Sequence, residues 1–151
     1  MEDREQLIQN ACVMIQDKVG NIVANSMIYE TEPWGFDSEN AFLNKVIHVQ
    51  TEHEPDVVLN KILAIETKLG RARGFGHWTD RMIDIDILFY DDFVIKTENL
   101  TIPHKELNNR KFVLVPLNEL IPDFLHPESK ISISQLLLKC TDSSEVKTYS
   151  A

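Results

Sequence analysis

Residues 71–92 read RARGFGHWTDRMIDIDILFYDD, with aspartates inside a run of isoleucines that follows a loop rich in arginine and glycine. Successive side chains of a strand point to opposite faces, so a strand over 81–90 would gather the isoleucines of Ile83–Ile87 on one face. Asp84 and Asp86 would then share the other face, about 6.6 Å apart at roughly 3.3 Å per residue. The stretch predicts a strand with an apolar core face and an acidic second face.

Helical spacing of apolar residues is found before and between the segments that favour strands. It runs from Asp3, which can cap a first helix, to Gly20, which can end it, and again from Pro55 to Gly70. β-Branched and alternating residues predict strands over residues 21–30, 44–50, 81–90, 93–97 and 112–117.

Shorter elements complete the expected fold. A turn at Asp91–Asp92 would join two strands into a hairpin, and short helical pieces are expected near Asn118–Leu120 and around Ser134–Leu138. This order predicts an α+β fold in which helices pack on one face of an antiparallel sheet. It is also the ferredoxin-like order βαββαβ with its first strand missing.

Composition limits the class of protein. With 151 residues, 43% of them hydrophobic, residues 1–151 are predicted to form a single domain with one core. The net charge of -9, from 24 acidic and 15 basic residues, argues against nucleic acid or an anionic membrane as a partner. Cys12 and Cys140 in apolar helical patterns, a charged N-terminus and the lack of an apolar run of about 18 residues predict a cytoplasmic protein.

Asp84 and Asp86 allow two interpretations. Charges on a half-exposed strand usually face solvent, and the pattern Asp-x-Asp is short and unspecific. Aspartate is nevertheless a poor strand former, and two like charges on one face repel, so a cation or arginines must offset them. Ligand atoms that are all oxygen favour magnesium over zinc, so the second interpretation is a magnesium site.

The residues before this strand indicate a phosphate site. Three of the five glycines lie between positions 70 and 76, and Arg71, Arg73 and Arg81 flank them. The planar guanidinium suits phosphate oxygens, and glycines let a loop open and close over a substrate. Trp78 is either an apolar plug on this lid or a core residue. Carboxylates, arginines and a glycine loop together indicate metal-assisted phosphoryl-type transfer from a nucleotide.

Four other residues have simple default roles. His104 and Arg110, in the loop at 100–112, are typical of a turn and of a surface charge. Phe42 and Asn44 are typical of packing and of capping. Residue type alone therefore assigns none of them to a site.

Together these stretches resemble the 6-hydroxymethyl-7,8-dihydropterin pyrophosphokinase family of folate biosynthesis. The resemblance runs from about Asp3 to about Pro127. Its most specific part is RxRxxxxWxxRxIDIDIL at residues 71–88, supported by YxTxPxG at 29–35, FLN at 42–44 and LTIPH…NRxFVLxPL at 100–117.

The resemblance implies that the pyrophosphoryl group of ATP passes to the hydroxymethyl oxygen of the pterin, with release of AMP and with two magnesium ions. Asp84 and Asp86 are implied to hold both ions. Arg71 and Arg81 are implied to be the catalytic residues that meet the phosphates, on the moving lid that also carries Trp78. The implied partners are small molecules, ATP and the hydroxymethyl dihydropterin.

The resemblance also implies a pterin site and an ATP site. The pterin would stack between Phe42 and Phe112, with Asn44 hydrogen-bonding its edge. Backbone groups that would close this pocket belong to Thr31, Pro33 and Trp34. The residues that match positions lining the ATP site are Glu66, Arg73, Trp78, Ile87, Thr101, His104, Lys105 and Arg110.

The start of the sequence departs from the family pattern. Family members begin with a strand and a turn similar to GSNxGDR, whereas this sequence opens at MEDRE. The missing strand would lie beside the Asp84–Asp86 strand, where its loss would expose ladder groups and open the core. Such a chain is expected to be fragile or inactive unless a second copy supplies the strand, so a monomer or a homodimer is expected.

Two other functions stay open on sequence grounds. A palm-type nucleotidyltransferase or cyclase also sets aspartates on an antiparallel sheet, but it would not explain Trp78, Phe42 or Asn44. A pterin- or nucleotide-binding protein that has lost its activity would keep the pocket and lack turnover.

Overall fold

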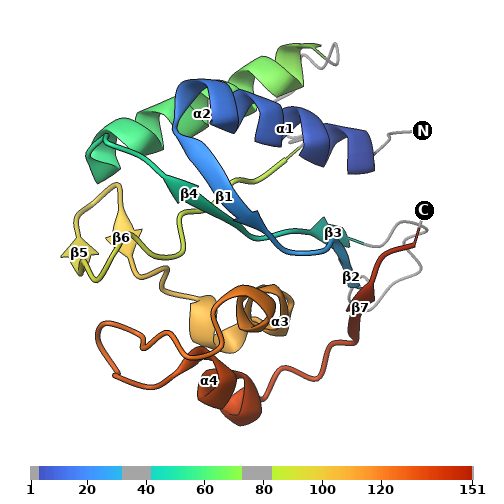
Figure 1. Cartoon of the computed structure of the whole chain (residues 1–151), viewed down its shortest axis with the longest axis vertical. Helices are drawn as coiled ribbons and strands as arrows, with labels where there is room; N and C mark the ends of the chain where they lie inside the picture. Colours follow the sequence, from blue (N-terminus) through green and yellow to red (C-terminus); the bar gives the residue numbers. More distant parts are fainter. Residues whose placement is uncertain (1–3, 32–41, 73–82, 151) are drawn as a thin grey trace. The chain divides into compact units, whose positions relative to one another are not determined.

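The computed structural model describes residues 4–31, 42–72 and 83–150, and the chain divides into two compact units. The first unit comprises Met1–Val23 and His48–Ile87, and the second comprises Ala24–Ile47 and Leu88–Ala151. Helices are combined with antiparallel strands, so the expected α+β class is confirmed (Figure 1). The ferredoxin-like arrangement, the missing first strand and the single domain stay predictions.

The first unit contains two helices that pack against each other, α1 (Arg4–Lys18) and α2 (Pro55–Ala72) (Figure 1). Their buried apolar residues recur at the predicted helical spacing: Leu7, Ala11, Ile15, Val58, Ile62, Ile65 and Leu69. Val19, one residue after α1, is also buried. The second helix does not end at Gly70 but continues to Ala72. Glycine inside a helix costs only about 1 kcal/mol relative to alanine, which the packed apolar face outweighs.

Strands β1 (Asn21–Asn25) and β4 (Ile47–Gln50) form a two-stranded sheet. Gly20, between α1 and β1, lies so close to the Gln50 carbonyl oxygen that a Cβ atom at this position would clash with it. The Thr51 hydroxyl donates a hydrogen bond of 2.7 Å to the carbonyl of the residue before Gly20. The end of α1 is therefore fixed against the end of β4, and only glycine fits there.

The segment that carries Asp84 and Asp86 forms no strand in its described part, 83–90, so the strand predicted over 81–90 is wrong there. Its side chains do alternate, since the isoleucines of Ile83–Ile87 are half-buried and the aspartates are exposed. A strand requires a neighbour for its backbone groups as well as alternating side chains, and the sequence pattern reports only the alternation.

The second unit contains a three-stranded antiparallel sheet in the order β3 (Phe42–Asn44), β2 (Tyr29–Thr31) and β7 (Val146–Thr148). β7 has no counterpart among the predicted strands, because its three residues are too short a run to show alternation. It pairs with β2 across more than a hundred residues of sequence, a contact that local patterns do not report.

Three further strand predictions are wrong in their extent. Of the strand expected over 44–50, only β4 (Ile47–Gln50) forms, and Asn44 belongs to β3. The single strand expected over 21–30 is broken at Ser26, whose hydroxyl hydrogen-bonds backbone groups instead of leaving them to a ladder. From 93–97 only β5 (Ile95–Lys96) forms, and it pairs with β6 (Thr101–Ile102) and not with the preceding segment. The hairpin therefore lies one turn later than expected.

Helix α3 (Lys111–Leu120) replaces the strand predicted over 112–117, and that prediction is wrong. Its apolar run packs at helical spacing against α4 (Ile133–Lys139), which agrees with the helix expected near 134–138. A short 3-10 helix, η1 (Leu107–Asn109), precedes α3. The buried core that these helices share consists of Leu107, Leu114, Leu117, Ile133 and Leu136.

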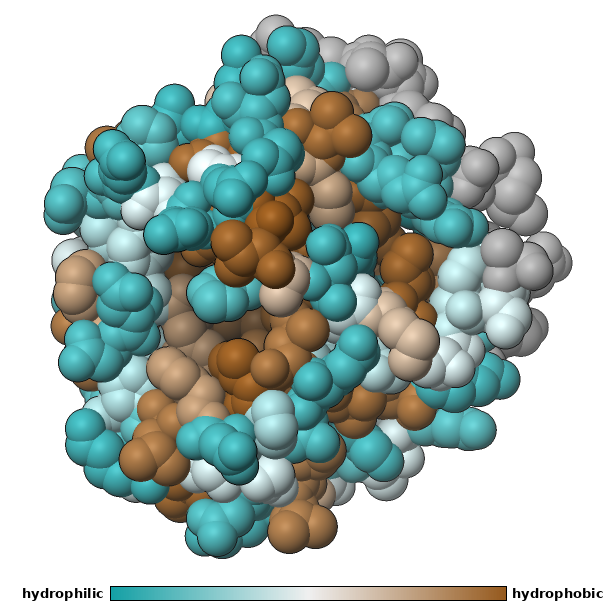
Figure 2. All heavy atoms as spheres, viewed as in Figure 1, coloured by the Kyte–Doolittle hydropathy of each residue, from teal (hydrophilic) through white to brown (hydrophobic). Residues whose placement is uncertain are grey.

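Apolar and hydrophilic side chains share the face drawn in Figure 2. Among the described residues, Val13 at 67% and Leu138 at 85% are the most exposed of the large apolar side chains, and exposed apolar residues of this kind are normal on a folded protein. No helix in the described part of the chain has the length and the apolar character required to cross a membrane.

Candidate functional site

One face of the β2–β3 pair brings together three residues predicted to bind the pterin. In the antiparallel register, Tyr29 lies opposite Asn44 and Thr31 lies opposite Phe42. Side chains that lie opposite each other, and side chains two apart on one strand, share a face of a sheet. All four side chains therefore form one surface, which we call the β2–β3 face.

Two properties of the β2–β3 face suit a planar ligand with polar edges. Phe42 is 57% exposed, so its ring is accessible for stacking. Thr31 is 5% exposed, and its Oγ1 atom has no hydrogen-bond partner among the described residues. A buried hydroxyl without a partner costs about 1–3 kcal/mol, so the Thr31 hydroxyl is a polar group that the described part of the fold leaves unsatisfied.

Helix α3 places Phe112 in its first turn. The Arg110 guanidinium lies 5.8 Å from the centre of the Phe112 ring, a cation–π contact. Asp142 caps the helix by accepting a hydrogen bond of 3.0 Å from the Lys111 N–H. The same carboxylate also accepts from the Ser144 hydroxyl at 2.6 Å and from the Ser144 N–H at 2.9 Å. Chiefly through Ser144, these bonds hold the pKa of Asp142 below its usual value, so an anion lies at the positive end of the helix.

Glu119 connects the last turn of α3 to β2, and the sequence pattern does not single it out. Its carboxylate accepts a hydrogen bond of 2.7 Å from the Tyr29 hydroxyl, and the Met27 N–H donates to both of its oxygens at 3.1 and 3.3 Å. Burial, and after it the hydrogen bond to Glu119, raises the pKa of Tyr29 to about 12. The only signal for Glu119 in the sequence is its seven-residue spacing from Phe112, which has meaning only in a helix.

Strand β6 and the segment between β6 and α3 hold further residues expected at the ATP site. Thr101 is half-buried and Lys105 is exposed. The His104 N–H donates to the Leu88 carbonyl at 3.0 Å, and Nδ1 of His104 accepts from the Glu106 N–H at 3.1 Å. The turn role predicted for His104 is confirmed.

In the first unit, Glu66 of α2 fixes the segment that carries the two aspartates. Its carboxylate accepts a hydrogen bond of 2.7 Å from the N–H of Ile85, which lies between Asp84 and Asp86, and Ile87 is half-buried like Ile85. No group of three or more His, Cys, Asp or Glu side chains in the described ranges is placed to hold a metal ion. Magnesium usually takes one or two carboxylates with water and phosphate oxygens, so two exposed aspartates fit it.

Several predicted residues lie outside the described part of the chain. Arg71 belongs to the last turn of α2, but its side chain is among those not described. The other residues outside the described ranges are Pro33, Trp34, Arg73, Trp78 and Arg81. Their assignment to the pterin pocket, the ATP site and the lid stays a prediction.

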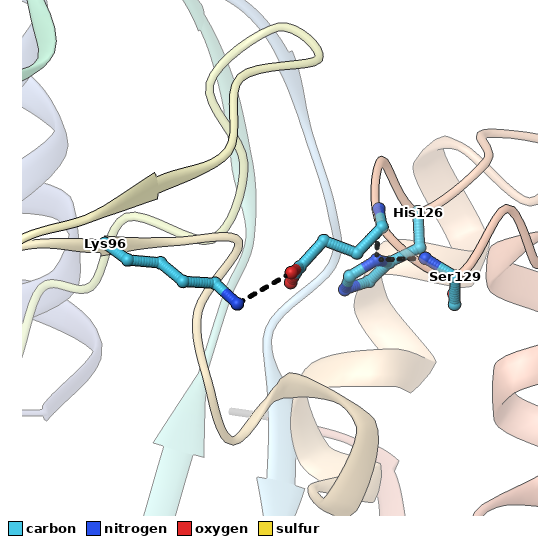
Figure 3. A network of polar contacts seen from close by, with 4 residues as sticks. Lys96, His126 and Ser129 are labelled. Carbon is cyan, nitrogen blue, oxygen red and sulfur yellow. Dashed lines mark hydrogen bonds and ion pairs between the residues drawn. The ribbon is translucent and has the colours of Figure 1, made fainter.

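A polar network closes the turn that precedes α4. Lys96 of β5 forms an ion pair of 2.8 Å with Glu128, and Nδ1 of His126 accepts hydrogen bonds from the N–H groups of Glu128 at 3.1 Å and Ser129 at 3.3 Å (Figure 3). His126 is 6% exposed, and its burial lowers its pKa, an effect that the charge of Glu128 opposes. The turn therefore depends on a neutral histidine.

Comparisons with known proteins give one consistent result. The chain matches the family model described as 7,8-dihydro-6-hydroxymethylpterin-pyrophosphokinase over residues 1–122. It is 41% identical over 130 residues to the 2-amino-4-hydroxy-6-hydroxymethyldihydropteridine pyrophosphokinase of Porphyromonas gingivalis, covering 84% of this chain and 88% of that protein. The protein of the same name from Haemophilus influenzae is 36% identical over 127 residues, which cover 84% of this chain and 78% of that protein. A folic acid synthesis protein of Pneumocystis carinii is 36% identical over 140 residues, covering 93% of this chain and 19% of that protein.

Proposed function

The chain belongs to the 7,8-dihydro-6-hydroxymethylpterin-pyrophosphokinase family, and from this we propose that it transfers the pyrophosphoryl group of ATP to 6-hydroxymethyl-7,8-dihydropterin in folate biosynthesis. The observation that carries the proposal is the family match over residues 1–122. In this reaction the hydroxymethyl oxygen attacks the β-phosphorus of ATP, the bond from that phosphorus to the α–β bridging oxygen breaks, and AMP leaves. The hydroxyl proton is released to solvent or to a base.

The proposed magnesium ligands are Asp84 and Asp86, which would hold two ions. Magnesium neutralises phosphate charge and orients the transferring group when it is bound. Support comes from the oxygen-only donor set, from the exposure of both aspartates and from the hydrogen bond by which Glu66 fixes the backbone between them. Glu66 would thereby orient the aspartates, and it is also proposed to line the ATP site.

The proposed pterin site combines the β2–β3 face with α3. Phe42 and Phe112 would stack on the two sides of the pterin, and Asn44 would hydrogen-bond its edge. The exposed ring of Phe42 and the Thr31 hydroxyl, which has no partner among the described residues, support this assignment. Pro33 and Trp34 are proposed to close the pocket.

The proposed ATP site draws on arginines and on the segment before α3. Arg71 and Arg81 would meet the phosphates as catalytic residues, because a guanidinium pairs with two phosphate oxygens at once. The other residues proposed to line the site are Arg73, Trp78, Ile87, Thr101, His104, Lys105 and Arg110. We also propose that the protein acts in the cytoplasm as a monomer or a homodimer, with small molecules and not nucleic acid as its ligands.

One incubation distinguishes the candidate functions. The protein is mixed with ATP, magnesium and 6-hydroxymethyl-7,8-dihydropterin, and the products are separated by chromatography. Formation of AMP that depends on the pterin is expected. Release of pyrophosphate would point to a nucleotidyltransferase or a cyclase, and binding of the pterin without turnover would identify an inactive binding protein.

A further inference from the structure

Glu119 makes a polar connection between α3 and β2 of the β2–β3 face. A charged carboxylate gives shorter and stronger hydrogen bonds than a neutral acceptor. It accepts from two donors two residues apart, the buried Tyr29 hydroxyl and the Met27 N–H. Two bonds to different points of one chain segment fix the position of the helix end as well as its rotation.

The rotation matters because of where Phe112 lies. Phe112 and Glu119 are seven residues apart, so at 100° per residue they lie about 20° apart around the helix, and at 1.5 Å per residue about 10.5 Å apart along it. The side of α3 that Glu119 turns toward β2 therefore also carries Phe112. Tyr29, whose hydroxyl donates a hydrogen bond to Glu119, belongs to the same face as Phe42.

The other end of α3 is held by a second carboxylate. Asp142 accepts from the Lys111 N–H at 3.0 Å and from both donors of Ser144. Two residues after Ser144 the chain enters β7, where Val146 pairs with Thr31 of β2. The helix is thus connected to the same three-stranded sheet at both of its ends.

We infer that Glu119 is a positioning residue for pterin binding, which sets the separation of Phe112 from Phe42 by fixing α3 against β2. The inference rests on the proposed function. A planar ring between two phenyl rings requires a fixed separation, because a gap of about 0.5–1 Å already removes a quarter to a half of the contact energy. Glu119 itself would touch neither substrate.

The test compares Glu119→Ala and Glu119→Gln in the full chain. KM for the pterin, KM for ATP and kcat are measured, together with the dissociation constant of the pterin by calorimetry. Glu119→Ala is expected to weaken pterin binding about tenfold, the ratio that corresponds to about 1.4 kcal/mol, while KM for ATP changes less than about twofold. Glu119→Gln is expected to recover most of the affinity, because its amide oxygen still accepts from the Met27 N–H.

Two control variants separate positioning from general damage. Asp123→Ala removes an exposed carboxylate four residues further on and is expected to leave both KM values unchanged. Tyr29→Phe removes one hydroxyl and keeps the ring, so it is expected to weaken pterin binding even if Glu119→Ala does not fold.

The possible failures are distinguishable. An active wild-type enzyme whose pterin affinity is unchanged in Glu119→Ala and in Tyr29→Phe would overturn the inference and leave the proposed function intact. Equal losses for ATP and pterin, with no recovery in Glu119→Gln, would also overturn it. A wild-type protein that makes no AMP would contradict the proposed function, and the calorimetric affinities would still test the inference. Absence of pterin binding by the wild type would overturn both.

Discussion

The turn that holds His126 predicts how stability depends on pH. Nδ1 of His126 accepts hydrogen bonds from the N–H groups of Glu128 and Ser129 at 3.1 and 3.3 Å. A protonated imidazole is a donor at both nitrogens, so protonation replaces two attractive contacts with two repulsive ones. Burial opposes the charged form as well, and it lowers the pKa of His126. The Glu128 carboxylate favours the charged form, but its ion pair with Lys96 weakens that effect.

The sign and the size of the effect follow from linkage. The folded pKa of His126 lies below the unfolded value of about 6.5, so the unfolded chain binds more protons between the two values. The free energy of unfolding is therefore unaffected above about pH 7.5 and falls as the pH drops through 6.5 toward the folded pKa. The limiting slope for one proton is about 1.4 kcal/mol per pH unit.

The assay is urea unfolding at pH 7.5, 6.5 and 5.5 for the wild type and for His126→Asn. The asparagine side chain can still accept from backbone N–H groups two or three residues on, but it does not titrate. The wild type is expected to lose up to about 1.4 kcal/mol more than His126→Asn between pH 7.5 and 5.5, most of it below pH 6.5. His48→Asn, at an exposed position of β4, is expected to behave as the wild type does. Equal pH slopes for the wild type and His126→Asn would refute the reasoning.

Three further predictions concern the proposed metal site and the core. Asp84→Asn or Asp86→Asn is expected to abolish AMP formation while leaving the melting temperature unchanged, because both side chains are exposed; wild-type turnover in either would contradict the metal assignment. Glu66→Ala removes the carboxylate that accepts a hydrogen bond from the Ile85 N–H. Steady-state kinetics should show a kcat reduced more than about tenfold, whereas an unchanged kcat would exclude a positioning role for Glu66. Leu114→Ala, at 0% exposure, should lower the free energy of unfolding in urea by about 2–5 kcal/mol, and a loss below about 1 kcal/mol would mean that the core rearranges to fill the space.

Helices α1, α2 and α4 were predictable because their signal is local. In α1 the buried residues recur every four positions from Leu7 to Ile15, and this spacing is visible in the sequence without any knowledge of what lies against it. Ser132 likewise marks the start of α4, where its side chain accepts from the Gln135 N–H. For these helices the local sequence itself indicates where the element begins or ends.

The strands were less predictable because a ladder needs two partners. The alternation at Ile83–Ile87 is present, yet this segment forms no strand in the described part of the chain. β7 pairs with β2 at a sequence distance of more than one hundred residues, with Val146 opposite Thr31. Alternation of apolar and polar side chains indicates which face of a segment is buried. Strand pairing depends on which other segment the fold places beside it.

The error at α3 has the largest consequence for the site. Val113 and Val115 with Phe112 favour a strand, and a short apolar run cannot be assigned by periodicity alone. In a strand, two residues separated by seven positions point to opposite faces, so Phe112 and Glu119 would have had no common role. In the helix they share a face, and the carboxylate that binds Tyr29 also determines where the aromatic ring is held. The pterin site proposed from motif residues therefore depends on a residue outside the motif, and its contribution follows only from the secondary structure between them.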